Sequence, residues 1–140
     1  MVEGPVVFIS HSSTDTWIAT QIATRIRDCG AEVFLDEADI AYGDDFDERI
    51  VQAAKAATEL LVLLTPWATN RPYIWLEMGV FWGDDKRMVG VLQGMTVKEF
   101  TADERTPVVL KRLSLLTLNE IDKYFEQLRV RVARWKEDHA

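Results

Sequence analysis

The sequence predicts an α/β fold of the flavodoxin-like kind: a doubly wound, five-stranded parallel sheet with helices on both faces. Five short apolar runs recur along the chain, and helical segments separate them. Short continuous apolar runs are typical of strands covered on both faces, and strict alternation with helices predicts one parallel sheet. Five parallel strands of this kind commonly take the order 2-1-3-4-5. A chain of 140 residues is the size of one domain, so residues 1–140 are expected to form a single unit.

Each predicted element follows from its own local pattern. The apolar runs, and hence the predicted strands, are Val6 to Ser10, Glu32 to Leu35, Leu60 to Leu64, Met88 to Leu92 and Leu113 to Leu116. Apolar side chains at helical spacing predict helices over residues 18–29, 46–54, 72–82 and 121–135. Gly30 supplies the stop of the first helix and Pro72 the start of the third. The polar stretch from Gly94 to Pro107 contains at most a short turn at Val97 to Phe100.

Composition and charge exclude several classes of protein. The net charge of −7 argues against a nucleic-acid partner, which would need a basic stripe. No segment approaches the roughly 18 apolar residues of a membrane span. The single cysteine, Cys29, cannot form an internal disulfide and ends an apolar helical stripe, so we expect a core residue in a reducing, cytoplasmic setting. His and Cys do not occur in pairs at ligand spacing, and no metal site is expected.

The first predicted strand ends in a burst of small polar residues, Ser10 to Asp15. Hydroxyl groups just before a helix are typical of a corner that binds a phosphate or a nucleotide. Ser12 and Asp15 have the spacing of a capping box, which would use one hydroxyl structurally and leave Ser10 and His11 available. A Ser-His-Asp triad is weakly supported, because the chain has no Gly-x-Ser-x-Gly elbow.

The expected strand order places a ligand crevice between the first and third strands, outside their carboxyl ends. The loops there are residues 10–15 and 65–67, and Trp67 could line the crevice or pack beneath its loop. A phosphoacceptor domain on the same fold would need an aspartate after the third strand, where this chain has Thr65. The third helix follows this loop directly.

Glu77 is the only charged residue in the third predicted helix. Tyr73 lies four residues before it and therefore on the same face. A carboxylate among aromatic rings beside a crevice can have a raised pKa or can stabilise a developing cation. The alternative is a solvated carboxylate on the outer edge of the helix.

Asp36 ends the second predicted strand and begins a polar loop that reaches Asp45 and contains Tyr42 and Gly43. A loop of this composition suits a ligand lid or a contact with another protein. It can equally be an ordinary connection whose tyrosine folds back on the domain.

Taken in order, these segments resemble the Toll/interleukin-1 receptor (TIR) domains, especially their bacterial branch. Val7 to Asp15 is similar to the first box of the family, and Leu63 to Pro66 to its third-strand ending. Val33 to Asp36, with the following Ile40 to Asp44 and Phe46, resembles the second strand and the loop after it. The resemblance spans nearly the whole chain.

Many members of this family cleave NAD+ at the bond between nicotinamide and ribose, with a glutamate on the third helix. The resemblance implies that Glu77 is that catalytic residue and that NAD+ is a substrate, with no cofactor. Such members usually place a tryptophan four residues before the glutamate, where this chain has Tyr73, and Arg71-Pro72 replaces a serine that often precedes it. The substrate-binding residues that it implies are Phe8, Ser10, His11, Ser12, Asp36, Gly43, Trp67 and Tyr73. The product would be ADP-ribose or a cyclic isomer, in bacterial immune signalling or virulence.

Two other functions remain open from the sequence. Many TIR domains act as adaptors through homotypic contacts, which here would use the loop from Asp36 to Asp45. The two functions are compatible, because catalytic members often need self-association to complete the site. Nucleoside deoxyribosyl transfer also uses a glutamate on a similar fold, but the match to the first box disfavours it.

Overall fold

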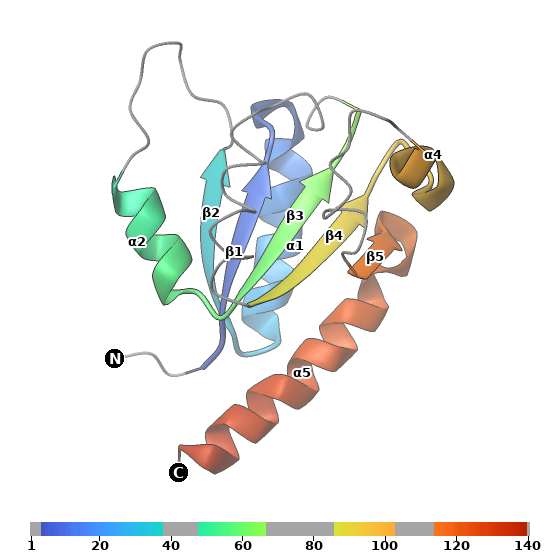
Figure 1. Ribbon diagram of the computed structural model, residues 1–140. Helices are drawn as coiled ribbons and strands as arrows, with labels where there is room; N and C mark the ends of the chain where they lie inside the picture. The colour runs from blue at the N-terminus through green and yellow to red at the C-terminus, as the bar shows by residue number, and fades with distance from the viewer. Residues whose placement is uncertain (1–3, 38–47, 67–85, 103–113, 140) are drawn as a thin grey trace.

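The computed structural model describes residues 4–37, 48–66, 86–102 and 114–139. Five parallel strands form one sheet in the order β2-β1-β3-β4-β5, which confirms the predicted topology (Figure 1). The strands are β1 (Val6–His11), β2 (Glu32–Glu37), β3 (Glu59–Leu64), β4 (Arg87–Leu92) and β5 (Ser114–Thr117). The helices are α1 (Thr16–Asp28), α2 (Glu48–Ala56), α4 (Val97–Ala102) and α5 (Ile121–Asp138), with short 3-10 turns η1 (Ser13–Asp15) and η4 (Leu118–Glu120). The predicted third helix, residues 72–82, lies outside the described residues.

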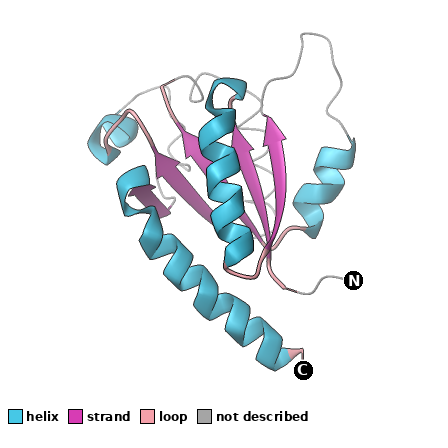
Figure 2. Cartoon of the chain, turned by 180° about the vertical axis from the view of Figure 1, so that it is seen from behind, coloured by secondary structure: helices cyan, strands magenta, loops and turns pink. Residues whose placement is uncertain are grey.

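Helices cover both faces of the sheet, as the apolar strands require. Figure 2 shows α1 lying across one face, seen from behind the view of Figure 1. Alternate residues of each strand point to opposite faces, so Val7 and Ile9 pack with α1 and α5 while Phe8 packs with α2 and α4. All six residues of β3 are buried. The core therefore consists of two apolar layers separated by the sheet.

Gly30 ends α1 as the sequence predicts. Its φ of +95° lies in the left-handed region that favours glycine. A Cβ atom at this position would also lie 3.0 Å from Cγ1 of Val132 in α5. Both the turn and the close approach of α5 therefore require a residue without a side chain.

Cys29 is a core residue, as expected. It is buried between α1 and α5, where its Sγ donates to the carbonyl oxygen of Phe125 at 3.7 Å. Desolvation raises the pKa of the thiol. A buried thiol with a raised pKa is a poor nucleophile, so this cysteine serves packing.

A buried polar cluster joins the start of β3 to α5. The carboxylate of Glu59 is 3% exposed and accepts from Nε and Nη2 of Arg131, at 3.2 and 2.9 Å. The hydroxyl of Tyr124 donates to Oε2 of Glu59 at 2.7 Å. Burial, followed by the neighbouring Glu59 charge, raises the pKa of Tyr124 well above its ordinary value. The cluster thus pairs the buried carboxylate of Glu59 with the guanidinium of Arg131.

Among the described helices, none is both long and apolar enough to cross a membrane.

We predict that Glu59→Gln lowers the free energy of unfolding by about 3 kcal/mol. The substitution leaves the mostly buried guanidinium of Arg131 without its carboxylate, and breaking one partner of a buried pair costs several kcal/mol. Urea unfolding followed by circular dichroism measures the change. Glu126→Gln, an exposed position on α5, is the matched control and should change stability by less than about 0.5 kcal/mol. Equal losses in the two variants would contradict the assignment.

The raised pKa of Tyr124 predicts an alkaline loss of stability. A group whose pKa is raised by folding contributes stability that is complete below its unfolded pKa, about 10, and is lost as pH rises above it. We expect the difference in unfolding free energy between the wild-type chain and Tyr124→Phe to shrink by about 1 kcal/mol from pH 10 to pH 11. Urea unfolding at the two pH values tests this, and a constant difference would reject it.

Candidate functional site

Five polar side chains are buried near the carboxyl ends of β1 and β3, on the two faces of the sheet. They form the polar corner, which consists of Ser10, His11, Ser12, Asp15 and Thr65. None of them is more than 6% exposed. Buried polar groups cost free energy unless they are hydrogen-bonded, so their partners show what holds each one.

Asp15 and Thr65 hold the two sides of the corner together. The Thr65 hydroxyl donates to Oδ2 of Asp15 at 2.7 Å, and this bond joins η1 to the residue after β3. The predicted capping box is therefore wrong in one half. The Ser12 hydroxyl does cap η1, since it accepts from the Thr14 amide at 3.4 Å, but the Asp15 carboxylate bonds to Thr65 instead of returning to Ser12. A partner that is distant in the sequence, the residue after β3, has replaced the local one.

His11 is the last residue of β1 and lies on the face that α1 covers. Its Nε2 atom is 3.4 Å from the Thr16 hydroxyl, which itself donates to the Ser13 carbonyl at 2.8 Å. Because a hydroxyl has one hydrogen to give, this arrangement favours the tautomer in which Nε2 carries the proton. His11 therefore supports the loop before α1.

Ser10 lies on the opposite face from His11, because neighbouring residues of a strand point to opposite sides. A nucleophile and its base must be within hydrogen-bond reach, so the two do not form a catalytic couple. Ser10 shares its face with Phe8, whose ring stacks on Phe34 with centroids 5.0 Å apart.

The Ser10 hydroxyl is a polar group of the corner that no described residue bonds. Its Oγ atom is buried and has no hydrogen-bond partner within the described part of the chain. Ser10 is opposite Asp36 of β2 on one side and Val62 of β3 on the other. The hydroxyl thus lies on β1, at the point where the strand order reverses, which is where α/β sheets bind ligands.

The structure brings only part of the predicted site together. Phe8, Ser10, His11 and Ser12 lie in or beside the corner, and the backbone of Asp36 is aligned with Ser10. The predicted residues Gly43, Trp67, Tyr73 and Glu77 lie outside the described residues. The Asp15–Thr65 pair was not predicted, although polar residues after two neighbouring parallel strands could have indicated it. Within the described ranges, no group of three His, Cys, Asp or Glu side chains could hold a metal ion.

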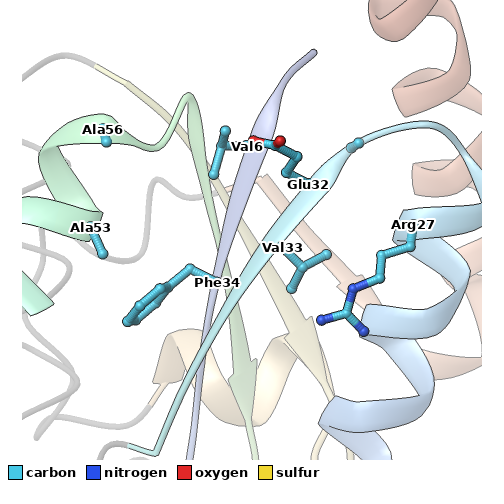
Figure 3. A pocket seen from close by; sticks show the side chains of 8 residues that line it. Val6, Arg27, Glu32, Val33, Phe34, Ala53 and Ala56 are labelled. Atoms are coloured by element: carbon cyan, nitrogen blue, oxygen red, sulfur yellow. The ribbon is translucent and has the colours of Figure 1, made fainter. Parts of the chain in front are cut away.

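A hollow of about 560 Å³ lies away from this corner, around the amino end of the edge strand β2. Figure 3 shows Phe34 and Ala53 on one side of the strand and Val33 and Arg27 on the other. The hollow wraps around a strand edge and contains none of the predicted site residues.

Comparison with known proteins gives both a family and a fold. The family model described as TIR domain matches residues 7–129. No curated protein matches the sequence. A prokaryotic SEFIR domain is 19% identical, with 91% of this chain and 92% of that one covered and a TM-score of 0.57. The TIR domains of the activated Roq1 resistosome are 14% identical, with 95% and 84% covered and a TM-score of 0.57. A diflavin flavoprotein A3 from Nostoc sp. is 12% identical, with 96% and 94% covered and a TM-score of 0.56. At these identities the solved structures show the shared fold alone.

We predict that removal of two hydroxyl groups of the polar corner, one at a time, affects the stability of the domain differently. Ser10→Ala should leave the free energy of unfolding unchanged or raise it by up to about 1 kcal/mol, because it removes a buried hydroxyl that has no described partner. The nearly isosteric Thr65→Val should lower it by about 2 kcal/mol, because Asp15 loses its donor. Urea unfolding of both variants makes the comparison, and a larger loss for Ser10→Ala than for Thr65→Val would contradict it.

Proposed function

Because the chain belongs to the TIR domain family, we propose that it is an NAD+ nucleosidase that breaks the bond between nicotinamide and ribose. The observation that supports this most is the polar corner at the reversal of the strand order, with the Ser10 hydroxyl buried and unused by the described residues. Such a hydroxyl costs stability unless a ligand bonds to it.

The chemistry proposed for the reaction is dissociative. When the bond from the ribose carbon to the ring nitrogen breaks, nicotinamide takes the electron pair and becomes neutral. The ribose is left as an oxocarbenium ion, as in glycoside hydrolysis. We assign Glu77 to this step, because a carboxylate held beside the sugar stabilises that cation. Water then adds and loses a proton to give ADP-ribose, or a nitrogen of the substrate's own adenine adds to give a cyclic isomer.

The polar corner would hold the ribose end of the substrate. Hydroxyl groups of ribose suit it better than the diphosphate, because the Asp15 carboxylate, one turn from Ser12, places a negative charge in the corner. In this arrangement Ser10 bonds a ribose hydroxyl directly. The Asp15–Thr65 bond keeps the two loops at a fixed separation, which is the positioning that a bound sugar requires.

The second candidate function is homotypic association, in which the loop from Asp36 to Asp45 is the proposed contact. One described residue favours a partner surface: Trp17, in the first turn of α1, is 74% exposed. The Roq1 structure, described as an activated resistosome, contains TIR domains within an assembly. Association and catalysis are compatible here. We place both in the cytoplasm, in bacterial immune signalling or virulence.

We predict that Glu77→Gln reduces the rate of nicotinamide release at least about a hundredfold, because the amide cannot stabilise the developing cation. Chromatography of nicotinamide, ADP-ribose and cyclic isomers after incubation of concentrated protein with NAD+ gives the rate. Glu126→Gln, an exposed glutamate on α5, is the matched control and should keep the wild-type rate.

Two results would count against this proposal. A folded Glu77→Gln variant that releases nicotinamide at the wild-type rate would reject the assignment of Glu77. A wild-type protein that self-associates and releases no nicotinamide at any concentration would favour the adaptor function instead.

A further inference from the structure

We propose that this domain has a second ligand site, a basic hollow that binds a phosphate oxyanion. It lies at the amino ends of the strands, whereas the polar corner lies at their carboxyl ends. The hollow has a volume of about 270 Å³. The lining residues that matter for binding are Glu59, Arg87, Arg131, Arg134, Trp135 and Asp138. The proposal is independent of NAD+ cleavage.

The hollow is formed where α5 runs past the amino ends of the strands, as Figure 1 shows. Arg131, Arg134 and Trp135 follow one another at helical spacing, so they lie on one face of α5. Arg87 is the first residue of β4 and reaches the same hollow from the sheet. The fold thus gathers three guanidinium groups from two elements that are far apart in the sequence.

The charges of the hollow are only partly neutralised by the protein. Arg131 donates two N–H groups to Glu59 and so neutralises the charge of the buried carboxylate. A guanidinium has five N–H donors, so three of them take no part in this pair. The exposed side chains of Arg87 and Arg134 form no ion pair or hydrogen bond with any described residue. Asp138 is the one other carboxylate of the lining, so the hollow is positive in a chain whose net charge is −7.

Phosphate is the anion that this chemistry fits best. Guanidinium groups bind phosphate oxygens through paired, charge-assisted hydrogen bonds. The volume suits a small ligand and is too small for a folded segment of another protein. Trp135 forms a half-buried wall, and His139 stacks on its ring with centroids 3.8 Å apart, which holds the indole in place. We therefore infer a ligand that carries a phosphate group, either inorganic or attached to a nucleoside.

A structural role is the competing account of these arginines. Cations near the end of a helix stabilise its last carbonyl groups, and Arg134 is close to the end of α5. That role predicts a loss of stability on substitution and no specific binding of anions. Ligand binding and unfolding therefore have to be measured on the same variants.

The test is a titration of the full chain with pyrophosphate at low ionic strength, followed by amide and indole chemical shifts in NMR. We expect saturable shifts at Arg87, Arg134 and the Trp135 indole. Arg87→Gln and Arg134→Gln should each weaken binding about fivefold, and Asp138→Asn should tighten it by about twofold, since it removes the opposing charge. Arg129→Gln is the matched control, an exposed arginine of α5 outside the hollow, and should change the affinity by less than about twofold.

A parallel titration with ADP identifies the source of the phosphate. Tighter binding of ADP than of pyrophosphate, lost in Trp135→Leu, supports a nucleoside diphosphate, whereas equal affinities support the inorganic anion. The proposal is overturned by the absence of saturable shifts below about 10 mM pyrophosphate. It is also overturned if Arg129→Gln weakens binding as much as Arg134→Gln, because charge alone would then explain the effect. Nicotinamide release should be unchanged in Arg87→Gln, which separates this site from the proposed catalytic one.

Discussion

The position of β1 between β2 and β3 is the constraint on which the rest of this structure depends. The chain leaves β1 to build one side of the sheet and returns to build the other, so the loops at its carboxyl end diverge. The parallel register then places Ser10 opposite Asp36 and Val62. The polar corner lies in an otherwise apolar sheet at the point where the strand order reverses.

The buried polar groups of the domain fall into two kinds according to their partners. Glu59 is fully engaged by Arg131 and Tyr124, and Asp15 receives the hydroxyl of Thr65. Groups of this kind hold elements together, because an unpaired charge at such depth would cost several kcal/mol. Ser10 is of the other kind, buried without a described partner. This contrast is the reason for placing the ligand at the carboxyl end of β1.

The carboxyl ends and the amino ends of the strands differ in electrostatic character. The difference suits the two ligands that we propose. Within the described residues, the polar corner at the carboxyl ends combines the hydroxyl groups of Ser10, Ser12 and Thr65 with the Asp15 carboxylate, a setting that suits sugar hydroxyl groups. In the hollow at the amino ends, guanidinium groups outnumber carboxylates among the lining residues, a setting that suits phosphate. The direction of the helices explains part of this asymmetry. They run antiparallel to the strands, so their C-termini lie at the amino ends of the strands, and basic side chains favour helix C-termini. The two proposed sites lie at opposite ends of the strands, so their ligands would not compete.

The sequence by itself determined the strands, their common order and the end of α1, because apolar periodicity and glycine report burial and backbone geometry locally. It also indicated the polar corner, since hydroxyl groups directly follow an apolar run. Only the tertiary structure decided the partners of the buried polar groups. Asp15 bonds Thr65, 50 residues away, and Glu59 bonds Arg131, 72 residues away. A local pattern records that a polar side chain is present, but its partner depends on which distant segment packs against it. Glu77 remains a prediction from the sequence, because it lies outside the described residues.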